Sequence, residues 1–487
     1  MKNIIFHVIK YLTAAILVLL SGLITLSPVS ARATEARIVI VHLRGVYESS
    51  ISVMPLTGAK AFKTVADASD VKNGASVYFV VPEEYLPGEF MLQFSSRNEH
   101  SDKPSVSQQN LFINNQDLEI RINPRFAGNP DSVRFQQGEL ENTAFVRFVK
   151  ENEKKKQQLA VLHDFLMNYN AKESDFYQRG LKEFERLRVA CNQSLLLAEK
   201  QDKGLFVSSV YQFNYVPNTL FTGSEPERLM AMIGHYFDGL DFCDTLMIRS
   251  TVINKWMDGY VNLHGRLAAA RVSRDSLFQS AATRAIEKAR GGNPLVYGWM
   301  VDYFYHGFES NHIPAGMKAL EQYTRDPNCL TSKRVQIEKR LKGMKSLSVG
   351  TKAPNIILSD AEGHLFDLSK AHVPSEQILL LFYSAGCSHC SDLIKELKPW
   401  FDALQTVQRP AVVAVSLDDS EADIKSWSAL ITALPDWKHL RAEGINSPVA
   451  NDYFLLSTPV MILLDSKTKE ILALPSSLSE LKSIFNK

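Results

Sequence analysis

The residues of this sequence best suited to chemistry are Cys387-Ser388-His389-Cys390. Two cysteines three positions apart can close into a small disulfide and open again, because a thiolate attacks a disulfide sulfur through a mixed-disulfide intermediate. The first cysteine must reach solvent to attack a disulfide in another protein, and the second must lie close enough to displace the product. The spacing therefore predicts thiol–disulfide exchange, with Cys387 attacking and Cys390 resolving.

The elements on either side of this motif would position the two sulfurs. Residues 377–383 form a continuous apolar run of strand length, which predicts a strand. Residues 391–405 carry apolar side chains at helical spacing, which predicts a helix. Cys387 would lie just ahead of that helix, where unpaired backbone N–H groups and the helix dipole favour a thiolate.

Two further features bear on this chemistry. His389 lies between the cysteines and can carry positive charge, which would stabilise the Cys387 thiolate and make the couple more oxidising. Thr458 and Pro459 precede an apolar strand at residues 460–464, and a cis bond there would project a loop over the cysteines. Backbone groups of Thr458 could then pair with an extended substrate peptide. Spacing alone leaves a trans proline at a strand start equally open.

The remaining cysteines limit what else the pair could be. Cys191, Cys243 and Cys329 are isolated in the sequence, so they supply no second pair for a zinc site. An inert local disulfide is the other alternative, but the order of strand, motif and helix favours redox exchange. We therefore expect neither a metal nor a cofactor. Whether Cys191 and Cys243 pair stays open.

The composition is that of an ordinary globular protein of more than one domain. The chain has 487 residues, and its 54 basic and 53 acidic side chains give a net charge of +1. Because nucleic-acid binding requires a basic surplus, we expect no nucleic-acid partner.

The N-terminus has the layout of a secretory signal peptide in residues 1–33. Lys2 and Lys10 precede an uncharged stretch with an apolar core, and Ala31-Arg32-Ala33 offers a cleavage site. The uncharged stretch also reaches membrane-spanning length, so an uncleaved N-terminal anchor, and with it a membrane association, stays open. Either form predicts export of the remaining chain to the periplasm or cell envelope, where disulfides are permitted.

Three stretches with different patterns of apolar residues follow. Residues 34–124 contain short apolar segments and turns, including an expected hairpin at 111–122, and predict a small all-β sandwich. Residues 125–345 carry long segments of helical periodicity and predict an all-α region. Residues 346–487 alternate strands and helices, which indicates an α/β domain. The expected fold is therefore multi-domain, with the cysteine pair in the last domain.

Several short motifs combine in residues 346–487. They are Gly350-x-x-Ala353-Pro354, Asp360-x-x-Gly363, Leu368-Ser369, the cysteine pair after its strand, and Tyr453-x-x-x-x-Thr458-Pro459-x-x-x-x-Leu464-Asp465. In this combination the stretch resembles the TlpA/ResA branch of thioredoxin-like proteins, with relatives among alkyl hydroperoxide reductase-type domains. The resemblance implies a thioredoxin core with an added N-terminal hairpin, thiol–disulfide exchange outside the cytosol, Cys387 as nucleophile, Cys390 as resolving residue and a cis Pro459. Residues 34–345 are similar to regions that precede such domains in envelope proteins.

The stretch departs from this family at two points beside the cysteines. Gly386 replaces the tryptophan that usually precedes the first cysteine, which loosens the site and removes a flat contact surface. The strand at residues 377–383 carries no acidic residue, so no buried carboxylate is identified as proton acceptor for Cys390.

The sequence therefore predicts an extracytoplasmic thiol–disulfide oxidoreductase that acts on protein thiols and disulfides and exchanges electrons with a redox partner protein. The main alternative is an envelope binding or assembly protein whose thioredoxin-like domain is structural or vestigial, because residues 34–345 make up over half of the exported chain. A peroxidase is disfavoured, because Leu380 stands where such relatives place a proline. The direction of electron flow, the redox partner, the role of residues 34–345 and the oligomeric state do not follow from the sequence.

Overall fold

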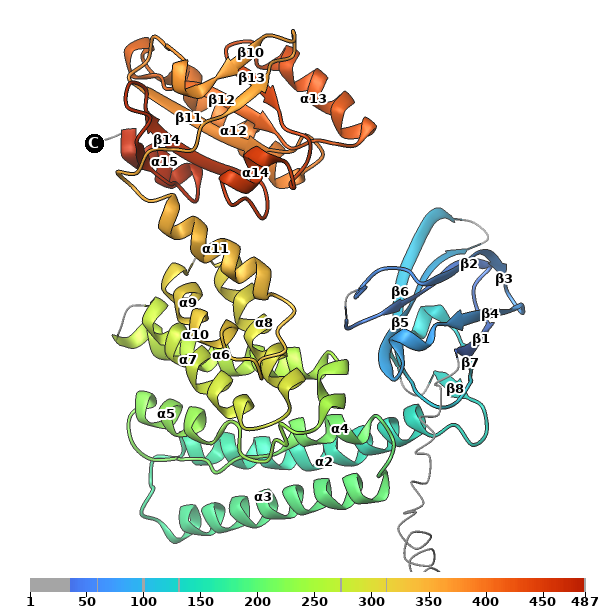
Figure 1. Ribbon diagram of the computed structural model, residues 1–487. Coiled ribbons are helices and arrows are strands. Elements are labelled where there is room, and N and C mark those ends of the chain that lie inside the picture. The colour runs from blue at the N-terminus through green and yellow to red at the C-terminus, as the bar shows by residue number, and fades with distance from the viewer. Residues whose placement is uncertain are drawn as a thin grey trace, which may run out of the picture. The chain divides into compact units, whose positions relative to one another are not determined.

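The structure is a computed structural model that describes residues 36–58, 60–98, 101–129, 132–271, 274–311 and 313–485 (Figure 1). These residues fall into two compact units, one within Met1–Pro217 and Leu246–Trp256, the other within Asn218–Thr245 and Met257–Lys487. The expected signal peptide or anchor at residues 1–33 lies outside the described residues. Within the described ranges, each helix is too short or too polar to span a bilayer.

The first unit contains two four-stranded sheets, with the strand orders β4-β1-β7-β8 and β3-β2-β5-β6. The strands are β1 (Arg37–Leu43), β2 (Glu48–Pro55), β3 (Ala66–Lys72), β4 (Ser76–Val81), β5 (Gly88–Asn98), β6 (Ser101–Ile113), β7 (Leu118–Ile122) and β8 (Val133–Phe135).

The two sheets share one apolar core. Val39 and Val41 of β1 are fully buried in it, and Ile40 between them points to the other face of the sheet. From the second sheet, Phe90 and Leu92 of β5 enter the same cluster. This cluster of alternating inward side chains from both sheets makes the region the predicted β-sandwich.

The predicted hairpin at residues 111–122 is wrong. β6 pairs with β5, whereas β7 lies in the other sheet between β1 and β8. β7 runs parallel to β1, with Ile120 opposite Val41, so its partner is the first strand of the region rather than its neighbour in sequence. β8 lies beyond residue 124, where we expected the β region to end, and it pairs with β7.

Helices follow the sandwich, as the periodicity of the middle stretch predicts. They are α2 (Glu141–Asn168), α3 (Asp175–Gln201), α4 (Ser208–Tyr211), α5 (Glu225–His235), α6 (Val252–Arg271), α7 (Arg274–Arg290), α8 (Pro294–Ser310), α9 (Pro314–Ala319), α10 (Glu321–Thr324) and α11 (Arg334–Ser346). Short 3-10 helices are η1 (Glu83–Tyr85), η2 (Pro124–Phe126), η3 (Gln212–Asn214) and η4 (Thr245–Arg249), with η5 (Leu368–Lys370) and η6 (Thr406–Gln408) further on.

The last part of the second unit is a five-stranded sheet with the order β13-β12-β11-β14-β15. β11, β12 and β13 are parallel, whereas β14 and β15 are antiparallel to their neighbours. The strands are β11 (Gln377–Tyr383), β12 (Ala411–Ser416), β13 (Lys438–Arg441), β14 (Val460–Asp465) and β15 (Ile471–Ala473). A separate hairpin of β9 (Ile357–Ser359) and β10 (Leu365–Asp367) precedes them, as the family resemblance implied.

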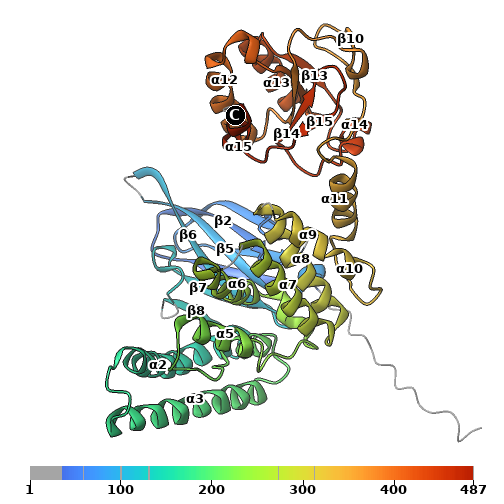
Figure 2. The ribbon, with the colours of Figure 1, turned by 90° about the vertical axis from the view of Figure 1, so that its left-hand side faces the viewer.

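Helices cover both faces of this sheet. α12 (Ser388–Ala403), α13 (Glu421–Ala433) and α15 (Leu478–Phe485) contribute to the apolar core on one face. α14 (Pro448–Asp452) packs on the opposite face, and Figure 2 shows α12 and α15 on one side of the sheet and α14 on the other. The central strand β11 is buried on both faces, which explains its continuous apolar sequence.

Candidate active site

Cys387 lies at the junction between β11 and α12. It is the residue immediately before the helix and has an extended backbone (φ −88°, ψ 121°). The Cys387 N–H donates to the Ser384 carbonyl at 3.2 Å, which closes the loop between strand and helix. The residue as a whole is half-buried rather than enclosed. It therefore stays accessible to a disulfide of another protein.

The pKa of the Cys387 thiol lies below its ordinary value. Partial burial opposes ionisation, but hydrogen bonds to the sulfur from the Cys390 thiol, from the Cys390 and His389 N–H groups and from Thr458 outweigh that effect. The two N–H groups belong to the first turn of α12, where backbone donors have no partner inside the helix. Cys387 therefore ionises more readily than an ordinary thiol, as an attacking sulfur requires.

Cys390 lies one turn inside α12 and is fully buried. Burial raises the pKa of its thiol to about 11, although hydrogen bonds from Thr458 and the Ser384 backbone act in the opposite direction. At neutral pH Cys390 thus keeps its proton, and its S–H group donates a hydrogen bond to the Cys387 sulfur. The two sulfurs lie in hydrogen-bond contact and have opposite acidities, which separates an attacking group from a resolving group.

The loop at Thr458 and Pro459 lies beside Cys387. The Thr458–Pro459 peptide bond is cis, as the family resemblance implied. The Cys387 thiol donates to the Thr458 carbonyl, with 3.9 Å between Sγ and O. The structure therefore brings together the two cysteines and the loop that the sequence proposed for substrate binding.

His389 acts on Cys387 through its backbone. Its N–H is one of the donors to the sulfur, and its side chain is exposed and lines the same cleft as Thr458 and Pro459. The effect of ring charge on the redox couple stays a prediction.

The other three cysteines have different surroundings. All five cysteines are free thiols, so Cys191 and Cys243 are not bonded to each other. Burial raises the pKa of Cys191, and it raises the pKa of Cys329 to about 11. Cys387 is therefore set apart from these two thiols by its position at a helix start.

A buried carboxylate supports the loop before Cys387, although the sequence did not single it out. Asp418 lies two residues after the end of β12, the neighbour of β11, and is 2% exposed. It accepts hydrogen bonds from the Ala385 N–H at 3.0 Å and from the hydroxyls of Ser384 at 2.7 Å and Ser416 at 2.6 Å. Asp418 thus holds the loop in place. Its sequence signal was an acidic residue at the end of a predicted strand.

Gly386 has a packing reason to replace the tryptophan of the resembling family. A Cβ atom at this position would lie 2.1 Å from Oδ1 of Asp423 in α13. The other oxygen of Asp423 accepts a hydrogen bond from the Ser420 hydroxyl at 2.6 Å, which holds the carboxylate in this place. A larger residue at 386 would have to displace Asp423.

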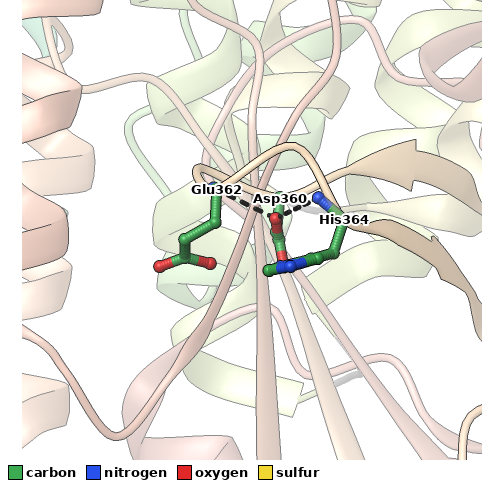
Figure 3. Close-up of side chains that lie close together, drawn as sticks. All are labelled: Asp360, Glu362 and His364. Atoms are coloured by element: carbon green, nitrogen blue, oxygen red, sulfur yellow. Dashed lines mark hydrogen bonds and ion pairs between the residues drawn. The ribbon is translucent and has the colours of Figure 1, made fainter.

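A second cluster of titratable groups lies in the turn between β9 and β10. Atoms of Asp360, Glu362 and His364 that could bind a metal lie within 4.8 Å of one another. Figure 3 shows that the Asp360 carboxylate accepts hydrogen bonds from the backbone N–H groups of Glu362 and His364. It also accepts a hydrogen bond from the side-chain ammonium group of Lys438, with Nζ at 2.6 Å. Because a metal would have to displace a bound ammonium group, we assign this cluster to the hairpin turn.

The sequence of residues 349–468 matches the AhpC/TSA family. This match begins before the hairpin of β9 and β10 and ends after β14, so it lies within the α/β region just described. The C-terminal domain is thioredoxin-like. A thioredoxin-like fold with two cysteines at the start of a helix is the arrangement of a redox enzyme.

The chain is also similar to several solved structures. A thioredoxin-like protein from Bacteroides caccae has 18% identity over 56% of this chain and 97% of its own, with a TM-score of 0.39. A thiol-disulfide oxidoreductase from Bacteroides fragilis has 24% identity over 28% of this chain and 98% of its own, with a TM-score of 0.25. A thiol:disulfide interchange protein from Bacteroides sp. has 25% identity over 28% of this chain and 88% of its own, with a TM-score of 0.24. A comparison with curated proteins found no match.

Proposed function

We propose that the protein is an exported thiol–disulfide oxidoreductase that exchanges disulfides with partner proteins through Cys387 and Cys390. The observation that carries this proposal is the pair of unlike thiols at the start of α12. Cys387 is half-buried with a lowered pKa, and Cys390 is buried with a raised pKa and donates to it.

The exchange proceeds in two steps that conserve atoms and electrons. The Cys387 thiolate attacks a disulfide of the partner, which forms a mixed disulfide and releases one partner thiolate. Cys390 then loses its proton and attacks the Cys387 sulfur, which releases the second partner thiolate. The partner disulfide gains two electrons, and the Cys387–Cys390 dithiol becomes a disulfide that a dithiol protein must reduce. With the protein starting oxidised, the same steps run in reverse.

The proposed location and partners rest on the sequence. The signal-peptide layout of residues 1–33 supports a place in the periplasm or cell envelope. The balanced net charge of +1 supports protein partners rather than nucleic acid.

Trapping of the mixed disulfide in cells tests the proposal. Cys390→Ala removes the resolving sulfur, so covalent adducts with partner proteins are expected on non-reducing gels after an alkylating quench. Cys387→Ala removes the attacking sulfur and serves as the matched control without adducts. Absence of adducts from Cys390→Ala, together with an ordinary acidity of Cys387, would instead support the envelope assembly protein described as the alternative.

A further inference from the structure

A cleft beside the cysteines lies within the second unit. Its volume is about 840 Å³, and Thr458 and Pro459 line it together with His389. The carbonyl oxygen of Thr458 is 3.9 Å from the Cys387 sulfur. Cys387 itself does not line the cleft, so Thr458 is the residue that connects the cleft with the reacting sulfur.

One wall of the cleft comes from helices that precede the thioredoxin-like domain in sequence. Phe308 of α8, Ile313 before α9, Met317 of α9 and Met344 of α11 line this wall. Phe454 and Leu456, from the segment before the cis-proline loop, line the other. These six side chains are apolar, and polar residues that include Glu309, Arg340 and Glu480 line the cleft beside them.

The helical wall packs directly on the domain. A Cβ at Gly343 of α11 would lie 2.8 Å from the Cβ of Phe454, so the helix backbone contacts that side chain. Lys339 Nζ of the same helix donates to Asn451 Oδ1 of α14 at 3.1 Å. The part of α11 that carries Met344 is thus held against the cis-proline side of the domain.

The charged groups of the cleft already have partners. Glu309 Oε2 lies 3.2 Å from Nε of Arg340. Glu480 accepts hydrogen bonds from the Ser476 N–H at 2.8 Å and the Ser476 hydroxyl at 2.9 Å. An occupant therefore meets little uncompensated charge, which favours an apolar group over a charged one.

We propose that this cleft binds a large apolar side chain next to the reacting cysteine of a partner protein. This inference rests on the proposed function and narrows its substrate class to extended, cysteine-bearing segments with a bulky apolar neighbour. Met317 and Met344 have flexible thioether chains, which adapt to apolar groups of several shapes. The helices before the thioredoxin-like domain thereby select the substrate.

Two disulfide-linked peptide dimers test the proposal. The peptides are identical except for phenylalanine or glutamine beside the single cysteine, and each dimer is mixed with fully reduced full-length protein. We expect the single-turnover rate constant to be about tenfold higher for the phenylalanine dimer, since burying one large apolar side chain is worth about that factor or more. Hydroxyethyl disulfide, too small to fill the cleft, reports the intrinsic reactivity of Cys387.

Variants of the two walls sharpen the test. Met344→Glu and, on the other wall, Leu456→Gln should each remove most of the preference for phenylalanine and leave the rate with hydroxyethyl disulfide unchanged. Val335→Glu is the matched control, because Val335 lies on the same helix, is 72% exposed and does not line the cleft. It should keep the preference.

The outcomes separate the two proposals. If reduced protein does not react with hydroxyethyl disulfide, the proposed function fails. If it reacts but treats both peptide dimers alike, or if folded Met344→Glu and Leu456→Gln both keep the preference, the cleft inference is wrong and the proposed function stands.

Discussion

Two buried aspartates of the thioredoxin-like domain each lie shortly after a strand but have different partners. Asp360 and Asp418 are 8% and 2% exposed, and both accept backbone N–H bonds. Asp360 also binds the Lys438 ammonium group at 2.6 Å. Asp418 instead accepts from neutral groups, the Ala385 N–H and the Ser384 hydroxyl among them.

The difference shows which cluster serves chemistry. At Asp360 the Lys438 ammonium group and two backbone N–H groups pair with the carboxylate. These contacts stabilise the hairpin turn and do not involve the cysteines. At Asp418 the donors belong to the loop that leads into Cys387, so the carboxylate fixes the path of the chain to the reacting sulfur. A search for closely spaced titratable groups alone would have chosen the hairpin turn at Asp360 as the functional site. The donors to Asp418 belong to the loop before Cys387, and this observation indicates the cysteine loop instead.

Replacement of Asp418 should have the largest effect. Asp418→Ala leaves the buried hydroxyl of Ser416 unpaired, at about 1–3 kcal/mol, together with the half-buried donors of Ser384 and Ala385. We expect Tm to fall by at least about 5 °C and the reaction of Cys387 with hydroxyethyl disulfide to slow about tenfold. Asp419→Ala, at the exposed neighbour, should change neither quantity. An unchanged reaction rate in folded Asp418→Ala would show that Asp418 only stabilises the fold.

Crowding of the same loop should have a moderate effect that a second substitution reverses. Gly386→Ala places a methyl group where the Asp423 carboxylate lies, so the carboxylate or the loop must shift. We expect a few-fold slower reaction with hydroxyethyl disulfide. Asp423→Ala in the same chain should restore the rate. A double variant as slow as Gly386→Ala would contradict the contact.

The acidity of Cys387 can be compared directly with that of a free thiol. Its pKa is lowered, so its thiolate persists to lower pH than in the unfolded chain and is lost as pH falls through the folded pKa. Peptide mapping after iodoacetamide pulses should give a midpoint below that of glutathione. Cys390→Ala removes the side-chain hydrogen bond to the sulfur and should raise the midpoint. An unshifted midpoint in the native protein would refute the role of the helix start.

Replacement of Asp360 should have the smallest effect on chemistry. Hydrogen bonding to Lys438, followed by the backbone bonds, lowers its pKa from 3.8 to about 2. The associated stability is present above pH 3.8 and is lost as pH falls toward 2. Asp360→Asn should therefore flatten the acid dependence of unfolding and leave the rate with hydroxyethyl disulfide unchanged. A slower reaction in this variant would link the hairpin to the active site.

Elements with a local signal were predictable from the sequence. The strand at residues 377–383 coincides with β11, because burial on both faces demands a continuous apolar run. The helix after the motif begins at Ser388 rather than at residue 391, because its first turn contains Ser388 and His389, which add nothing to the apolar period. Strand β13 was missed, since its four residues give too short a pattern, and β10 was expected only as part of the hairpin that the family resemblance implied.

Features that depend on distant pairing were not predictable. β7 pairs in parallel with β1, which no adjacent turn residue encodes, so the hairpin at residues 111–122 was the wrong choice. Asp418 reaches the loop before Cys387 only because β12 lies beside β11. The cleft walls come from α8, α9 and α11 as well as from the cis-proline loop, and their meeting follows from tertiary packing.

The burial of Cys390 bears on how fast a partner protein would be released from the mixed disulfide. In the proposed exchange, release of a bound partner requires Cys390 to lose its proton, and burial, which raises the pKa of this thiol, opposes that loss. The lifetime of the proposed mixed disulfide would then be governed by the second sulfur rather than by the first. A partner chain held in this way would have an interval in which to rearrange before its release.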